Sequence, residues 1–80
     1  MTKDKINLND DFDFEGLKKK TKKYYNHQDI DERDGLKIKF EESWLHIRKS
    51  NTEPIIRIYS EAKSESDCNK IIDNFKALIT

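Results

Sequence analysis

The sequence predicts an α+β fold, a two-layer sandwich in which two helices cover one face of an antiparallel sheet of four or five strands. Apolar and polar residues alternate along several short segments, which is typical of half-buried strands, and two longer segments carry apolar residues at helical spacing. Only short connections separate consecutive strand segments, so neighbouring strands should pair antiparallel, because parallel pairing needs longer crossovers. Two amphipathic helices can then cover only one face of the sheet.

A strand, a helix and a short extended stretch are predicted for the first part of the chain. Residues 3–8 end in an alternation of polar and apolar side chains, which favours a strand. A helix is expected over residues 13–24, with Asp11 or Asp13 as N-cap, because a carboxylate accepts hydrogen bonds from the unpaired amides of a first turn. Whether the stretch at 28–33 pairs decides between four strands and five. The helical spacing is that of Phe14, Leu17, Thr21 and Tyr24.

Three strands are predicted in the middle of the chain. The dipeptide Asp34-Gly35 favours a turn. After it, apolar residues alternate with polar ones along 36–41, 44–48 and 55–62, which indicates three half-buried strands.

The last segment predicts a helix that runs to the C-terminus. Ser64 precedes Asp67 by three residues, a spacing that resembles a capping box. An apolar stripe follows on one face of this helix. It consists of Cys68, Ile71, Ile72, Phe75, Leu78 and Ile79. Because Cys68 belongs to this stripe, we interpret it as a core residue.

Composition limits the class of protein. A chain of 80 residues supports one small domain with a thin core. Its formal net charge is zero, so no global field attracts nucleic acid or an anionic membrane. One cysteine excludes an internal disulfide, and the sequence contains neither a signal peptide nor an apolar run of membrane-spanning length. We therefore expect a soluble, cytoplasmic protein with neither a membrane nor a nucleic acid as partner.

The connection between the second and third of these strands is unusually polar. It reads R-K-S-N-T-E-P over residues 48–54 and contains no glycine. Asn51 tolerates a left-handed backbone, which would turn consecutive N–H groups inward as an anion-binding nest. Ser50 and Thr52 add hydroxyl donors, and Arg48 adds a planar fork suited to two phosphate oxygens. The alternative is a polar turn whose side chains only cap their own backbone.

The other two residues of this loop shape it. Pro54 fixes its own φ and biases Glu53 toward an extended conformation. A carboxylate repels phosphate, so we expect Glu53 to point away from a bound anion and to brace the loop by accepting backbone amides. The loop is not a Walker A motif, because G-x-x-x-x-G-K-[ST] does not occur in the sequence.

The loop and its flanks resemble a known family. R-K-S-N-T-E-P-I-I-R-I-Y, preceded by D-G-L-K-I-K-F and followed by E-A before the last helix, resembles the C-terminal (fourth) domain of the α-D-phosphohexomutases. These are the phosphomannomutase/phosphoglucomutase enzymes and the phosphoglucosamine mutases, whose last domain carries an R-x-S-[NG]-T-E-P loop. The resemblance implies that the loop binds the phosphate of a phosphosugar, a hexose phosphate or bisphosphate. The implied phosphate-binding residues are Arg48, Ser50, Asn51, Thr52 and Arg57.

The resemblance also implies what this domain lacks. Family enzymes carry a phosphoserine in the first domain, a D-x-D-x-D magnesium loop in the second and a sugar-selecting loop in the third, and none of these is found here. Residues 1–80 are therefore expected to be one domain of a larger intramolecular phosphotransferase that interconverts hexose 1-phosphate and hexose 6-phosphate. Its partners would be the other three domains of the same chain. Mg²⁺ is expected in the full-length enzyme and no cofactor in this domain, which is expected to be inactive alone.

A second interpretation starts from the lysines. The run between Lys18 and Lys23 either forms a solvated helix face that complements the helix dipole, or makes the chain a stand-alone nucleic-acid-binding module. Tyr24, Tyr25 and Trp44 would then stack on bases. The zero net charge and the lack of an RNP-type aromatic pattern argue against the nucleic-acid module.

Two further features are interpreted as structural. The acidic stretch at 10–15 superficially resembles a metal loop, but Phe12 and Phe14 within it are expected to anchor the start of a capped helix in the core. His46 is expected to lie on the sheet surface. It forms no catalytic triad, because no cysteine or serine nucleophile accompanies it.

Overall fold

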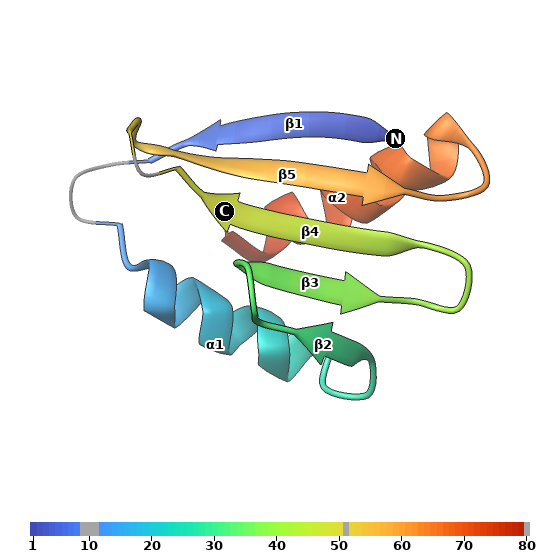
Figure 1. The fold of residues 1–80 in the computed structure, drawn as a ribbon, viewed down its shortest axis with the longest axis horizontal. Coiled ribbons are helices and arrows are strands. Elements are labelled where there is room, and N and C mark those ends of the chain that lie inside the picture. Colours follow the sequence, from blue (N-terminus) through green and yellow to red (C-terminus); the bar gives the residue numbers. More distant parts are fainter. Residues whose placement is uncertain (9–11, 51, 80) are drawn as a thin grey trace.

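The two-layer α+β sandwich is confirmed by the computed structural model, which describes residues 1–8, 12–50 and 52–79 (Figure 1). Helices and strands follow one another along these residues in the order that the sequence predicts. In the described parts of the chain the elements are β1 (Thr2–Asn7), α1 (Phe14–Tyr24), β2 (Asp29–Asp31), β3 (Leu36–Lys39), β4 (Trp44–Lys49), β5 (Ile55–Glu61) and α2 (Glu65–Ile79). Neither helix in those parts combines the length and the hydropathy needed to cross a bilayer.

The sheet is antiparallel throughout and has five strands, in the order β1-β5-β4-β3-β2. The stretch predicted at 28–33 therefore does pair, as β2 against β3. The first strand, β1, does not neighbour the next strand along the chain. It lies at the far edge beside β5, where Ile6 is opposite Ile56 and Lys5 is opposite Arg57. This long-range pairing brings the N-terminal residues next to the strand that follows the polar loop (Figure 1).

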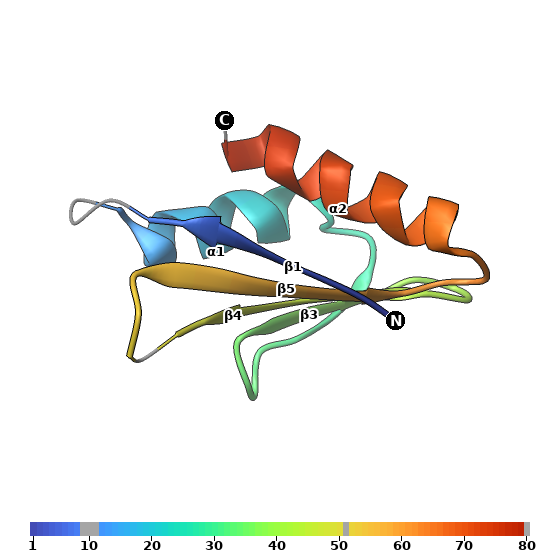
Figure 2. The ribbon, with the colours of Figure 1, turned by 90° about the horizontal axis from the view of Figure 1, so that it is seen from above.

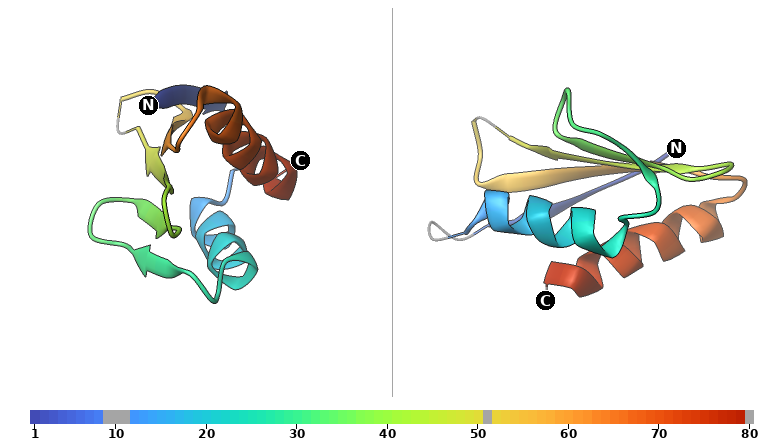
Figure 3. Two further views of the ribbon diagram at one scale, coloured as in Figure 1. Left: turned by 90° about the vertical axis from the view of Figure 1, so that its right-hand side faces the viewer. Right: turned by 90° about the horizontal axis from the view of Figure 1, so that it is seen from below.

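Both helices lie on the same face of the sheet and leave the other face open (Figures 2 and 3). Alternation along the strands fits this arrangement, since the covered face carries the apolar side chains and the open face the polar ones. The residues of the core cluster that are buried are Leu17, Tyr25, Leu36, Ile38, Leu45, Ile47, Ile56, Ile58, Ile72 and Phe75. Two buried polar groups have partners, because Thr21 donates to the Leu17 carbonyl at 2.8 Å and Ser60 donates to the Trp44 carbonyl at 3.0 Å.

The helix caps explain where the helices begin. Asp13 is the N-cap of α1, and its carboxylate accepts a hydrogen bond from the Gly16 amide at 3.0 Å. Glycine suits position 16, because a Cβ there would lie 2.4 Å from the Asp13 carboxylate. Ser64 accepts from the Asp67 amide at 3.1 Å, which confirms the predicted capping interaction of α2. Asp11, the other candidate cap, lies outside the described residues.

Two connections project from the open face, away from the helices (Figure 2). One joins β2 to β3 and contains the Asp34-Gly35 turn, and the other joins β4 to β5 and contains the polar loop. Figure 3 shows the same two projections from the opposite side. The fold therefore places the candidate site on the open face, at the end of β4.

Candidate anion-binding site

A row of three basic residues crosses the open face beside the polar loop. Arg48 of β4 lies directly opposite Arg57 of β5, which in turn lies directly opposite Lys5 of β1. Directly opposite residues of antiparallel strands point to the same face, with Cβ atoms about 5 Å apart. Their chain neighbours Ile47 and Ile56 are buried, so the row points away from the helices. Because like charges directly opposite destabilise a sheet, this basic row fits a site that an anion neutralises.

Two carboxylates lie close to the row but hold it loosely. Arg48 Nε is 3.5 Å from Asp34 Oδ1, and Arg57 Nη2 is 3.9 Å from Glu53 Oε2. All four side chains are about half exposed or more, with fractions from 48% to 68%. Ion pairs of this length and exposure contribute only about 0.2–1 kcal/mol. No ion pair to Lys5 occurs among the residues that the structure describes.

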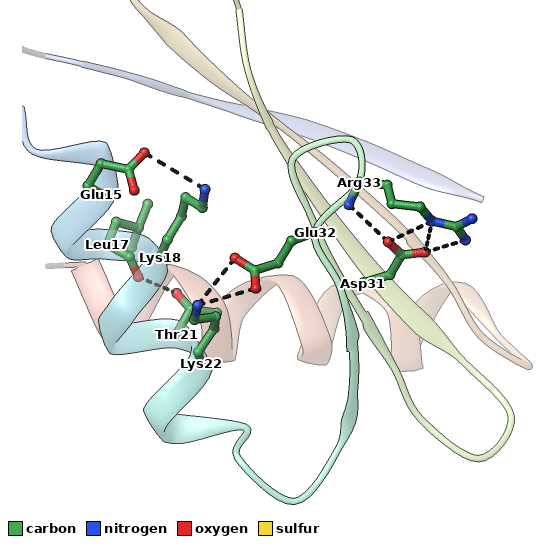
Figure 4. A network of polar contacts seen from close by, with 8 residues as sticks. All are labelled: Glu15, Leu17, Lys18, Thr21, Lys22, Asp31, Glu32 and Arg33. Carbon is green, nitrogen blue, oxygen red and sulfur yellow. Dashed lines mark hydrogen bonds and ion pairs between the residues drawn. The ribbon is translucent and has the colours of Figure 1, made fainter.

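Arg33 makes a useful contrast with the basic row. Its guanidinium donates three hydrogen bonds of 2.7–3.2 Å to the Asp31 carboxylate, as Figure 4 shows. These bonds hold the pKa of Asp31 well below its usual range. The Arg33 fork is therefore already occupied, whereas neither arginine of the basic row makes a hydrogen bond to a carboxylate in the described structure.

The hydroxyl of Ser50 shapes the polar loop. Its oxygen accepts hydrogen bonds from the amides of Thr52 at 3.3 Å and Glu53 at 3.2 Å, a local turn typical of serine. The Ser50 amide donates to the Ile55 carbonyl at 3.0 Å, which closes the loop onto β5. Because the Ser50 oxygen acts as acceptor for these amides, its proton remains available for the Thr52 hydroxyl, 3.4 Å away, or for a bound anion.

The bracing role predicted for Glu53 is not found in the described part of the chain. Among the described residues, the Glu53 carboxylate accepts no backbone amide and pairs instead with Arg57 across the loop. The shorter serine side chain stays near its own backbone and reaches these amides, so Ser50 takes the role expected of Glu53. Asn51, the expected left-handed residue of an anion nest, lies outside the described residues.

The turn between β2 and β3 is packed against Arg48. Gly35 has φ +74, and a Cβ there would lie 2.3 Å from the Ile47 carbonyl oxygen and 3.2 Å from Arg48 Cγ. His46 Nε2 lies 2.6 Å from the Asp34 carbonyl oxygen, which can only accept, so Nε2 is the donor. This bond anchors the turn to β4 one residue before Ile47. The sequence identified Asp34 only as part of a turn.

The lysines of α1 are partly paired. Figure 4 shows Lys18 near Glu15, at 3.8 Å, and Lys22 near Glu32 of the β2–β3 connection, at 3.2 Å. Two of the five lysines between Lys18 and Lys23 therefore have a carboxylate close by. This is the arrangement of a solvated helix face rather than of a basic patch.

The aromatic residues near these lysines do not form a stacking surface. Tyr25 is 8% exposed and belongs to the core, and its burial raises the pKa of its hydroxyl. On the other face of the sheet, Lys37 Nζ lies 4.7 Å from the centre of the Trp44 ring. Tyr24 is 54% exposed, and its ring makes an edge contact with Tyr25 at 4.8 Å between centroids. The nucleic-acid module gains no support.

The described residues do not suit a metal ion. In residues 1–8, 12–50 and 52–79, no three His, Cys, Asp or Glu side chains gather closely enough to hold one. In the acidic stretch, the Asp13 carboxylate caps α1, while Phe12 and Phe14 pack against the core as expected. Asp10 and Asp11 lie outside the described residues.

Comparison with known families decides the class of this domain. A family model described as "Phosphoglucomutase/phosphomannomutase, C-terminal domain" matches residues 4–78. The chain belongs to this family. The family suggested by the R-K-S-N-T-E-P loop is thereby confirmed, and the match extends over nearly the whole chain.

Individual relatives agree with the family match. The chain is 52% identical over 44 residues to a phosphoglucomutase/phosphomannomutase of Thermococcus kodakarensis, a match that covers 55% of this chain and 10% of the relative. It is 35% identical over 81 residues to a phosphoglucosamine/phosphogalactosamine mutase of Sulfurisphaera tokodaii, covering 99% of this chain and 18% of the relative. A phosphomannomutase of Methanocaldococcus jannaschii is 32% identical over 63 residues, which cover 79% of this chain and 14% of the relative. The chain thus spans less than a fifth of the length of these relatives.

Proposed function

We propose that this domain binds the phosphate group of a hexose phosphate within a phosphohexomutase. The observation that carries the proposal is the placement of Arg48 directly opposite Arg57, beside the polar loop and without a hydrogen-bonded carboxylate. A phosphate carries two negative charges and several acceptor oxygens, so it neutralises both guanidinium groups at once.

The proposed donors lie in the loop and on the two strands that it joins. Arg48 offers a planar fork, while Ser50 and Thr52 offer hydroxyl protons from the loop between β4 and β5. Arg57 adds positive charge from the next strand. Asn51 is included on the family resemblance alone. Such a grip positions a phosphate and stabilises its charge, which are electrostatic and entropic contributions to catalysis rather than bond-making ones.

The proposed activity of the whole protein follows from its relatives. Their names include mutases of glucose, mannose, glucosamine and galactosamine phosphates. We propose that the protein containing this domain interconverts hexose 1-phosphate and hexose 6-phosphate, with the other domains of the same chain as partners. The loop donors address phosphate, so the identity of the sugar is assigned to the other domains. Magnesium binding elsewhere in the enzyme and a cytoplasmic location remain predictions.

This proposal is tested by titrating phosphate into the protein while the backbone amide signals are recorded by NMR. Inorganic phosphate should shift the amide signals of Ser50 and Thr52 and leave those of Lys18–Lys23 unchanged. Affinity should be weak, roughly millimolar, because a single anion makes few contacts. Potassium chloride at matched ionic strength is the control, since it screens charge without offering a tetrahedral anion. Shifts confined to α1, with the loop unchanged, would refute the phosphate site.

A further inference from the structure

We infer that Asp34 and Glu53 are internal counter-ions of the phosphate site, which hold Arg48 and Arg57 when phosphate is absent and compete with phosphate when it arrives. The inference rests on the proposed function and deepens it. It assigns a role to two carboxylates that a phosphate-binding site would be expected to exclude.

The position of Asp34 is fixed by its backbone and not by Arg48. His46 donates to the Asp34 carbonyl at 2.6 Å, and Gly35 packs its backbone against the Ile47 carbonyl. These contacts hold the Asp34 backbone against β4, which keeps its carboxylate within reach of the Arg48 guanidinium. Asp34 therefore places a negative charge 3.5 Å from Arg48 Nε, on the guanidinium that phosphate is proposed to bind.

The geometry of both pairs leaves the arginine donors available. At 3.5 Å the nearest Asp34 oxygen faces Nε of Arg48, and among the described residues no carboxylate accepts a hydrogen bond from the two terminal nitrogens, which can form a fork. Glu53 approaches Arg57 at 3.9 Å, beyond hydrogen-bonding distance. Both carboxylates thus neutralise charge without occupying the donors.

The two carboxylates weaken the binding of phosphate. Without the carboxylates, the two opposite arginines would repel each other, and phosphate would relieve that repulsion. With them, three basic side chains face two carboxylates, so the row keeps a net charge of about +1 and a phosphate dianion is repelled by both carboxylates at short range. Removing either carboxylate charge should therefore tighten phosphate binding, by about two- to fivefold for exposed pairs of this kind.

The test compares variants in which an amide replaces a carboxylate, at the two site positions and at one control position. Asp34→Asn and Glu53→Gln each remove one carboxylate from the site, and the double variant removes both. Glu32→Gln is the control, because it removes one charge from the same β2–β3 connection while its carboxylate pairs with Lys22 of α1. Inorganic phosphate is titrated into the 80-residue chain at fixed ionic strength, and the dissociation constant is taken from the Thr52 amide. Thermal melting confirms that each variant is folded.

Each outcome is distinct. The inference predicts two- to fivefold tighter binding for each site variant, a larger gain for the double variant, and wild-type affinity for Glu32→Gln. Equal affinity in the site variants and the control would overturn it. Weaker binding in Asp34→Asn would also overturn it, since Asp34 would then orient Arg48 instead of competing with phosphate. If the wild-type loop does not respond to phosphate at all, the proposed function itself fails.

Discussion

The arginines of this domain differ in what their guanidinium groups already bind. Arg33 of the β2–β3 connection is committed to Asp31, the last residue of β2, by three side-chain hydrogen bonds. Arg48 has only a carboxylate at 3.5 Å, and a like charge stands opposite it on β5. At the scale of single residues, availability of donors therefore separates the candidate phosphate ligand from a structural arginine.

Substitution of Arg48 tests this distinction. Arg48→Ala should weaken phosphate binding about tenfold to a hundredfold, because a charge-assisted hydrogen-bonding group contributes about 1.5–3 kcal/mol. Arg48→Lys should give an intermediate affinity, since it restores the charge but not the two-pronged geometry. In a full-length enzyme, kcat/KM should follow the same order. Phosphate titration and steady-state kinetics provide the measurements.

Folding provides the control for that comparison. Arg48 is exposed and lies outside the core, so its variants should melt at the wild-type temperature. Arg33→Ala should leave phosphate affinity unchanged. Wild-type affinity in Arg48→Ala, or a loss explained entirely by unfolding, would make Arg48 a scaffold residue.

At the scale of elements, local features were predictable from sequence and long-range ones were not. Asp13 and Ser64 cap the helices as expected, because a cap depends on residues within one turn. The placement of Lys5 in the basic row required the β1–β5 pairing, which no local pattern specifies. The approach of Asp34 to Arg48 depends on how a turn folds over a neighbouring strand.

The polar loop contains one feature that was predictable from the sequence and one that was not. Its phosphate-binding character was inferred from residue types and from the family resemblance, which need no coordinates. Among the described residues Ser50 and not Glu53 accepts the loop amides, while Glu53 pairs with Arg57 of the next strand, a contact that residue types alone do not specify.

The contact between β1 and α2 gives the fold a measurable response to pH. Asp4 of β1 forms an ion pair with Lys76 of α2, and its hydrogen bond to that ammonium lowers the pKa of the Asp4 carboxyl. A carboxyl with a lowered folded-state pKa stabilises the fold above its unfolded-state pKa, about 3.9. That contribution is lost as the pH falls through the lower, folded-state pKa.

Asp4→Asn should therefore destabilise the domain at neutral pH but not in strong acid. The two side chains are more than a third exposed, so the pair contributes only about 0.2–1 kcal/mol, equivalent to a fall in Tm of about 1–6 °C. Thermal melts at pH 7 and near pH 2 would measure the difference. Asp73→Asn is the control, because it removes an exposed carboxylate from α2, the helix that carries Lys76. An equal loss of Tm at both pH values would mean that the ion pair is not the cause.

At the scale of the whole molecule, the division of the sheet into a covered and an open face separates stability from binding. The helices lie on one face, and both connections project from the other (Figure 2). The buried apolar side chains belong to the covered face, and the basic row belongs to the open one. Variants on the open face can consequently change anion binding with little effect on the core. Among the described residues, the proposed phosphate site therefore lies on the open face of the sheet and not between the sheet and the helices.

The open site leads us to expect no mutase activity from this domain alone. The 80-residue chain alone should bind phosphate but should not convert glucose 1-phosphate or mannose 1-phosphate into the 6-phosphate. Phosphoryl transfer needs a donor and an acceptor held in line, with groups that stabilise the transferring phosphoryl. The described site offers donors for one phosphate only, and the chain spans 10–18% of the length of the relatives cited above. An assay that couples 6-phosphate formation to a dehydrogenase would measure turnover, with a full-length relative as positive control. Turnover that persists in pure protein and disappears in Arg48→Ala would show that this domain carries catalytic groups of its own.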